Sequence, residues 1–212
     1  MKKYIISVIA ISLMAISFIP IDYSPEKSIA DMAIVSSVTI MTNDGAGSGF
    51  VVGPGLIMTA RHVVEGCAEA RIITSDGRVY PVVGIHLSEI ADIAILDYVG
   101  PDLPCVILAG KDTLKVGDVL FVVGSPFGIP ELRAIMSQGI VSGLGRDIEG
   151  LGVDLCITDA TVNPGNSGGA VFATDGTVVG MAVAVFSSGS GLNICLTVED
   201  LINELAIYGK EN

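Results

Sequence analysis

The 212-residue sequence has no tryptophan, only 6 phenylalanines and 5 tyrosines, and few basic residues, with 11 Lys and Arg against 23 Asp and Glu. The formal charge of -12 argues against binding to a phosphate backbone, which needs basic surface to displace counterions. Nucleic acid is therefore not an expected partner. With 26 glycines and few aromatics, the apolar residues are mostly Val, Ile, Leu and Ala separated by many turns. This composition favours sheet over a helix bundle.

Cysteine is also sparse, and its spacing excludes a class of site. The four cysteines are Cys67, Cys105, Cys156 and Cys195, and no two of them form a C-x-x-C pair. The sequence therefore has no zinc or redox motif of that kind. In an exported chain the four could form two disulfides, in one of three connectivities, or remain free thiols buried in strands.

Within residues 1–21, Lys2 and Lys3 precede a run without charge at 4–21, and Asp22 ends this run. Such a run indicates an export signal, either a cleaved signal peptide or a retained membrane anchor barely long enough to span. Because the lysines should stay on the cytoplasmic side, the rest of the chain is expected outside, in the periplasm or the extracellular medium. Residues 22–35 are expected to be a polar tether.

Residues 36–212 consist of short apolar runs separated by turns. A dozen such runs predict an all-β sandwich or barrel, and Asp-Gly pairs within 75–77 and 174–176 indicate hairpins. One amphipathic helix is expected at 198–207, with Thr197 as its N-cap and Gly209 as its stop. The expected strands are 38–41, 49–52, 56–59, 71–74, 79–85, 93–98, 119–123, 135–141, 155–159, 170–173, 178–185 and 192–197.

The most informative stretch is GNSGG at 165–169, centred on Ser167. A nucleophilic serine needs a tight turn and backbone N–H groups that converge on the developing oxyanion, and glycine permits both. The stretch also satisfies G-x-S-x-G, the nucleophile elbow of α/β-hydrolases. Chain order excludes that class, because its histidine follows the serine, whereas both histidines here precede Ser167. An elbow also needs a helix after it, and a hairpin is expected there instead.

Two residues upstream complete a candidate catalytic set. His62 lies just after the apolar run 56–59, where its imidazole could point into a cleft. Asp92 opens a strand too apolar to be exposed, and a buried carboxylate needs a partner. An aspartate bound to the imidazole would fix its tautomer and stabilise the imidazolium formed when histidine takes the serine proton. By contrast, His86 is expected in a surface loop without a partner, and Asp97 as a solvated strand-end acid.

Five segments, in this order, resemble the protease domain of the HtrA/Deg family over residues 35–209. They are TARHVV at 59–64, DIAIL at 92–96, LKVGD at 114–118, GSPFG at 124–128 and TDATVNPGNSGG at 158–169. Five matches in order are far more specific than any one alone. The resemblance implies an all-β, chymotrypsin/trypsin-like fold. It would have two perpendicular six-stranded β-barrels, at about 36–120 and 121–212, with a C-terminal helix and the active site between the barrels.

The resemblance also implies a function and roles. The chain would be a serine endopeptidase that cleaves unfolded or misfolded exported polypeptides through an acyl-enzyme. His62 would be the general base, Asp92 its orienter and Ser167 the nucleophile, and the N–H groups of Gly165 and Ser167 would form the oxyanion hole. No metal or organic cofactor is implied, and homo-trimers are common in the family. The family's PDZ domains have no counterpart in this sequence, so peptide-gated regulation in cis is not expected.

A specificity pocket is predicted from the same resemblance. Thr161, at its base, carries no charge, whereas a carboxylate there would select Lys or Arg. The strand Ala182-Val183-Ala184 would line the pocket and pair with substrate, and Asn193 would partly fill its floor. Burying an unpaired Lys or Arg head is costly, whereas a modest aliphatic side chain gains from burial. Cleavage after Val, Ile, Ala, Leu or Thr is therefore expected.

The chain order of the two barrels also bears on the cysteines. Cys67 and Cys105 belong to the first expected barrel, and Cys156 and Cys195 to the second. Pairing within each barrel is the expected connectivity, with the second bridge favoured because its cysteines lie on strands expected to be neighbours.

Two other functions remain open from the sequence alone. The first is a protease-fold chaperone or peptide-binding module with weak or regulated catalysis, which the intact His62, Asp92 and Ser167 disfavour. The second is a structural surface protein, for which five matched segments have no explanation. The sequence does not decide whether residues 163–166 hold the oxyanion hole in an active register.

Overall fold

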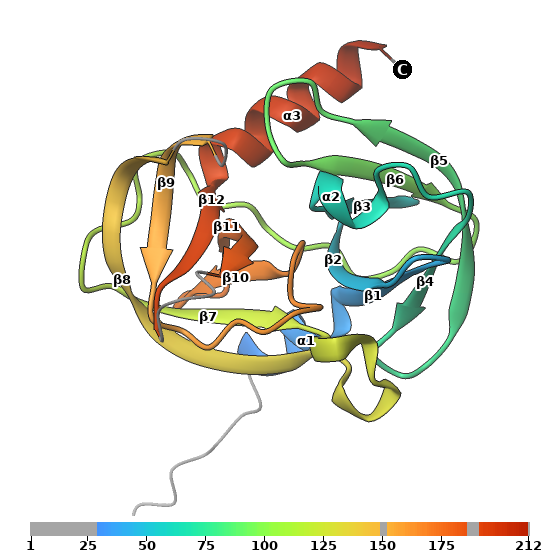
Figure 1. Ribbon diagram of the computed structural model, residues 1–212, viewed down its shortest axis with the longest axis horizontal. Coiled ribbons are helices and arrows are strands. Elements are labelled where there is room, and N and C mark those ends of the chain that lie inside the picture. Colours follow the sequence, from blue (N-terminus) through green and yellow to red (C-terminus); the bar gives the residue numbers. More distant parts are fainter. Residues whose placement is uncertain (1–28, 149–151, 186–190, 212) are drawn as a thin grey trace, which may run out of the picture.

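The computed structural model describes residues 29–148, 152–185 and 191–211, so the predicted leader lies outside the described residues. The strands form two closed antiparallel barrels of six strands each (Figure 1). The predicted all-β double-barrel fold with a C-terminal helix is confirmed. Each of the twelve predicted apolar runs corresponds to a strand.

The first barrel has the strand order β1-β2-β3-β6-β5-β4. Its strands are β1 (Ser37–Thr42), β2 (Ala46–Gly53), β3 (Leu56–Thr59), β4 (Ala70–Thr74), β5 (Val79–Leu87) and β6 (Ala94–Tyr98). The second barrel has the order β10-β11-β12-β9-β8-β7. Its strands are β7 (Val119–Gly124), β8 (Ile135–Ile148), β9 (Gly152–Thr158), β10 (Ala170–Ala173), β11 (Val178–Val185) and β12 (Asn193–Thr197).

Short helices connect and cover the barrels. They are α1 (Ile29–Val35), α2 (Arg61–Val64), the 3₁₀ turns η1 (Pro126–Gly128) and η2 (Pro130–Leu132), and α3 (Val198–Glu211). Helix α3 buries Leu201 in the core and lies across the top of both barrels in Figure 1. No helix among the described residues is long and apolar enough to cross a membrane.

Two predictions about the ends of the chain were wrong. Part of the expected tether is helix α1, which buries Ala33 in the core shared by the barrels. Its C-terminal carbonyls are satisfied by the hydroxyls of Ser36 and Ser37, which donate to Met32 and Ala33 at 2.8 and 2.7 Å. Helix α3 runs past the predicted stop at Gly209, which is not among the glycines of positive φ that can end a helix.

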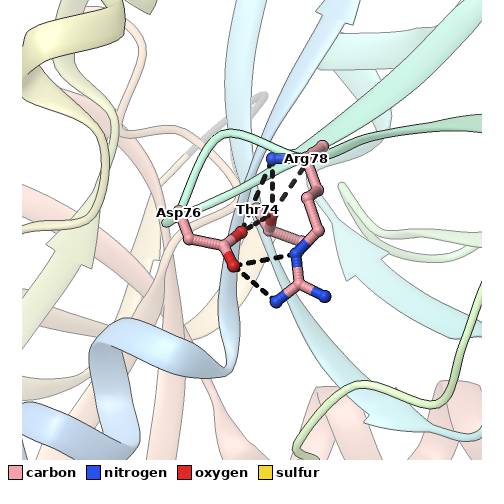
Figure 2. Close-up of polar contacts among 3 residues, drawn as sticks. All are labelled: Thr74, Asp76 and Arg78. Atoms are coloured by element: carbon pink, nitrogen blue, oxygen red, sulfur yellow. Dashed lines mark hydrogen bonds and ion pairs between the residues drawn. The ribbon is translucent and has the colours of Figure 1, made fainter.

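The β4–β5 hairpin shows how the predicted Asp-Gly turn closes. Gly77 has φ of +89° and donates its N–H to the Thr74 carbonyl at 2.8 Å. The carboxylate of Asp76 accepts hydrogen bonds from the hydroxyl of Thr74 and the guanidinium of Arg78 (Figure 2). The bond from Arg78 holds the pKa of Asp76 well below its usual range. Asp76 therefore stays ionised in the turn.

The strand neighbours predicted for one cysteine pair are confirmed, but the predicted bridges are not formed in this structure. Cys195 on β12 is directly opposite Cys156 on β9, and both side chains are buried. All four cysteines, including Cys67 and Cys105, are free thiols. Burial raises the pKa of Cys156 to about 12 and that of Cys195 well above its ordinary value, so both thiols stay protonated.

Candidate active site

His62 and Asp92 come from different connecting segments of the first barrel and are joined by two hydrogen bonds. His62 lies in α2, directly after β3, and Asp92 lies in the bend before β6. The Nδ1 atom of His62 is 2.7 Å from Oδ2 of Asp92, and the backbone N–H of His62 donates to Oδ1 at 3.0 Å. Their side chains remain 48% and 28% exposed, respectively. The carboxylate therefore orients the imidazole at a site that a ligand can reach.

The hydrogen bonds also set the charge states. The bond to Asp92 raises the pKa of His62, against burial, which lowers it, and with help from the negative charges of Asp92 and Glu65. Burial opposes the charged form of Asp92, but the hydrogen bonds and charge of His62 outweigh it and lower the pKa of that carboxyl. An ionised Asp92 accepts the proton on Nδ1, which leaves Nε2 of a neutral imidazole free to accept a proton.

Arg61 ties the loop of His62 to the loop of Asp92. Its guanidinium donates to the Ser88 carbonyl at 2.7 Å and to the carboxylate of Glu65 at 2.6 Å. The loop from Ser88 to Ile93 is closed by a hydrogen bond from the Ser88 N–H to the Ile93 carbonyl at 3.0 Å. The sequence reasoning missed Arg61, although its place next to His62 could have suggested a supporting role.

Ser167 lies on a glycine-rich loop of the second barrel that is packed against the first. The Ser48 N–H donates to the Ser167 carbonyl at 2.8 Å, and the Gly168 N–H donates to the Ala182 carbonyl at 2.7 Å. Gly168 has φ of +84°, and a Cβ there would lie 2.7 Å from the nitrogen of Ala60. Only glycine fits that approach. The loop of Ser167 thus touches the chain two residues before His62.

Among the described residues, the Ser167 hydroxyl makes no hydrogen bond with the His62 imidazole. It donates to the Val183 carbonyl at 3.3 Å. Among the described residues, that bond replaces the predicted contact with His62. Nucleophile–base hydrogen bonds are often long or poorly aligned until substrate binds, and rotation about χ1 can redirect the hydroxyl.

The turn before Ser167 orients the Gly165 N–H. Gly165 has φ of +96°, the Asn166 N–H donates to the Asn163 carbonyl at 2.9 Å, and the Phe127 N–H donates to the Pro164 carbonyl at 2.7 Å. A trans peptide points its N–H opposite to its carbonyl, so the Gly165 N–H points away from Phe127. Within the described chain, neither this N–H nor that of Ser167 has a hydrogen-bond partner.

The residues predicted for the specificity pocket lie on β11, β12 and the loop after β9. Ala182 and Val183 are buried, and Ala184 is opposite Ile194 in the β11–β12 register. The Asn193 side-chain amide is buried and donates to the Ala160 carbonyl at 2.6 Å. Thr161 is exposed, and its carbonyl accepts the hydroxyl of Ser137 at 2.7 Å.

A second histidine–aspartate pair contradicts the expectation for His86 and Asp97. His86 lies within β5 rather than a loop, and its Nε2 atom is 2.9 Å from Oδ2 of Asp97. The Tyr208 hydroxyl of α3 donates to the other oxygen of Asp97 at 2.8 Å. These contacts fasten α3 to the first barrel.

In the part of the chain that the structure describes, no group of three or more His, Cys, Asp and Glu side chains could hold a metal ion.

Two closed barrels, with a histidine–aspartate pair on one and a glycine-flanked serine loop from the other packed beside it, define a trypsin-like peptidase domain. Residues 47–181 match the family described as "Trypsin-like peptidase domain", and the chain belongs to that family. Within this family, the chain is HtrA-like.

A Chlamydia pneumoniae protein named "Probable periplasmic serine endoprotease DegP-like" is 38% identical over 152 residues, covering 68% of this chain and 30% of that protein. "Protease Do-like 1, chloroplastic" of Arabidopsis thaliana is 33% identical over 180 residues, covering 78% of this chain and 40% of that protein. The chain therefore spans less than half the length of either relative. The solved structure "HtrA-type protease AlgW with tripeptide" has a TM-score of 0.74 at 30% identity, covering 82% of this chain and 60% of that one.

Proposed function

We propose that this protein is a serine endopeptidase that hydrolyses peptide bonds in polypeptides through an acyl-enzyme. His62 is the general base, Asp92 orients it and Ser167 is the nucleophile. The observation that carries the proposal is the double hydrogen bond between His62 and Asp92, at 2.7 and 3.0 Å. It fixes both the tautomer and the direction of the imidazole beside the loop of Ser167.

The chemistry follows from these positions. As Oγ of Ser167 attacks the substrate carbonyl carbon, its proton passes to Nε2 of His62, and Asp92 stabilises the imidazolium that forms. In the tetrahedral intermediate the former carbonyl oxygen bears a negative charge, which the N–H groups of Gly165 and Ser167 stabilise. The intermediate collapses as the C–N bond breaks and the imidazolium protonates the leaving amine. Water then attacks the acyl-enzyme, with His62 again as base, and releases the acid and the serine.

The substrates proposed are unfolded or misfolded exported polypeptides, cleaved outside the cytoplasm. The periplasmic endoprotease named among the relatives supports this location, as does the uncharged run at 4–21 after two lysines. An uncharged Thr161 and the small side chain of Ala182 favour Val, Ile, Ala, Leu or Thr before the cut. Sequencing the products of a denatured protein tests this, and a dominant Lys or Arg before the cut contradicts it.

The catalytic proposal is tested by labelling with a fluorophosphonate probe, which reacts with an activated serine. The wild type should be labelled and should hydrolyse a denatured, fluorescently tagged protein. Ser167→Ala should do neither, while its melting temperature stays close to that of the wild type. The matched control is Ser142→Ala, which removes an exposed hydroxyl from β8 and should keep full labelling. Labelling of Ser167→Ala at the wild-type rate would refute the assignment.

A second candidate function is a protease-fold chaperone or peptide-binding module with regulated catalysis. It is favoured by one contact, the bond from the Ser167 hydroxyl to the Val183 carbonyl at 3.3 Å, which uses the proton that His62 would accept. In that case the wild type and Ser167→Ala would suppress the aggregation of a denatured protein equally well, and the wild type would not hydrolyse it.

A further inference from the structure

Three buried hydroxyl groups lie between the two barrels, outside the proposed triad. Thr39 on β1 and Ser48 on β2 belong to the first barrel, and Ser125 follows β7 in the second. Their exposed fractions are 2%, 1% and 2%. The Thr39 hydroxyl donates to Oγ of Ser125 at 2.6 Å, and the Ser125 N–H donates to Oγ of Ser48 at 2.8 Å. We call these three residues the hydroxyl cluster.

Ser48 of this cluster holds the loop of Ser167 at two points. Its hydroxyl donates to the Gly165 carbonyl at 2.7 Å, and its N–H donates to the Ser167 carbonyl at 2.8 Å. Its own carbonyl accepts the hydroxyl of Thr59 at 2.6 Å. Every polar group of Ser48 is therefore used. The two carbonyls that it holds belong to the peptides that directly follow Gly165 and Ser167, the residues whose N–H groups form the proposed oxyanion hole.

Ser125 holds the opposite side of that loop through a neighbouring turn. Its carbonyl accepts the Gly128 N–H at 3.2 Å, and the turn places Phe127 at φ of +61°. Phe127 in turn donates its N–H to the Pro164 carbonyl at 2.7 Å. Gly165 is thus held between Ser48 on one side and the turn of Ser125 on the other.

Gly165 needs such external support because glycine places little restriction on its own backbone. A larger residue would not fit, since a Cβ at Gly165 would lie 2.5 Å from the nitrogen of Phe127 and 2.7 Å from the carbonyl oxygen of Ser125. The direction of the Gly165 N–H is therefore set by hydrogen bonds to its neighbours. If the Ser48 hydroxyl is removed, the carbonyl of Gly165 and the N–H of Ser125 lose their partner inside a buried site.

We infer that Ser48 is a positioning residue for the proposed oxyanion hole. Its hydroxyl, held by the Ser125 N–H, fixes the Gly165–Asn166 peptide through the Gly165 carbonyl. The Phe127 N–H holds the carbonyl of the preceding Pro164–Gly165 peptide, which carries the Gly165 N–H. With the peptides on both sides of Gly165 held, its N–H stays directed toward the developing oxyanion. The inference rests on the proposed function, because it assigns Ser48 a role in the same reaction. Ser48 touches no reacting atom and acts through Gly165.

The test compares Ser48→Ala with Ser37→Ala. Ser37 is the matched control, because its hydroxyl is also buried on a strand of the first barrel but donates to the Ala33 carbonyl of α1 at 2.7 Å. Removing one oxyanion donor outright costs about 10²- to 10³-fold in kcat, so disturbing the position of one should lower kcat by about 10- to 10²-fold. KM should stay within about twofold, since the substrate contacts are unchanged.

Two further measurements separate positioning from general destabilisation. Affinity for a peptide boronate, which places an oxygen in the oxyanion hole, should fall for Ser48→Ala by the same factor as kcat/KM. The pH midpoint of kcat/KM should not move, because His62 and Asp92 are intact. Ser37→Ala should lower the melting temperature while keeping kcat and boronate affinity at wild-type values.

The outcomes distinguish failure of the inference about Ser48 from failure of the proposed endopeptidase function. A folded Ser48→Ala with wild-type kcat and boronate affinity overturns the inference while leaving the endopeptidase intact. A wild type that neither reacts with fluorophosphonate nor hydrolyses peptides removes the proposed function, and the inference with it. If Ser48→Ala does not fold, Thr39→Val replaces it, because this near-isosteric change removes only the bond to Ser125. A smaller fall in kcat supports the inference, and an unchanged kcat overturns it.

Discussion

Replacing Asp92 by asparagine should inactivate the enzyme by reversing the tautomer of His62. The backbone N–H of His62 can only donate, and it lies 3.0 Å from Oδ1 of Asp92. In Asp92→Asn the amide oxygen must take that position, so the amide nitrogen faces Nδ1 across the 2.7 Å contact. A donor there forces Nδ1 to be the acceptor and leaves the proton on Nε2. The imidazole can then no longer accept the proton of Ser167.

The expected loss is about 10⁴-fold in kcat, the size measured when the aspartate of a Ser-His-Asp triad is replaced by asparagine. This corresponds to about 5 kcal/mol of lost transition-state stabilisation. The assay is kcat/KM on a fluorogenic peptide, with the melting temperature as a check on folding. The control is Asp97→Asn, which alters the pair with His86, whose atoms are 2.9 Å apart on the same barrel. A folded Asp92→Asn within about tenfold of wild type would refute the reasoning.

Three further predictions follow from the charge states and the pocket. Activity requires neutral His62, whose raised pKa should place the acid limb of kcat/KM above the ordinary histidine value of about 6.5. The stability that the protonated His62 adds is fully present below about pH 6.5 and is lost as the pH rises through the raised pKa. A limb below about 6.5 would contradict this. Thr161→Asp should shift cleavage toward Lys and Arg in product sequencing, and an unchanged profile would show that Thr161 lies outside the pocket. Iodoacetamide should alkylate exposed Cys105 in the native protein but neither Cys156 nor Cys195; equal rates, or a bridge between the latter two found by mass spectrometry, would contradict their burial as free thiols.

The strands were predictable because each is encoded by a local apolar pattern. Strand β3 at Leu56–Thr59 and strand β10 at Ala170–Ala173 have the predicted bounds. Strand β8 extends well beyond the prediction, to Ile148, because its pairing with β9 continues through several register shifts. Such bulges break the period of two in the sequence, so the apolar run alone does not reveal where the strand ends.

The candidate site was predictable where a side chain carries its own motif. His62 and Ser167 each lie in a distinctive segment, and Asp92 stands out as an acid at the start of an apolar run. His86 and Asp97 were misjudged because part of their environment comes from α3, since Tyr208 is 111 residues from Asp97 in sequence. A local window contains no trace of that contact.

The hydroxyl cluster was not predictable from local sequence for the same reason, because its members are far apart in the chain. Ser48 and Gly165 are 117 residues apart, and Thr39 and Ser125 are 86 apart. The proposed base and the proposed nucleophile also come from different barrels, so their geometry depends on the inter-barrel contact. Directional hydrogen bonds fix the register of such a contact, which close apolar packing alone fixes less sharply. Removing a hydroxyl that bonds across the two barrels should therefore lower kcat. Removing a hydroxyl that bonds within one barrel should lower only stability.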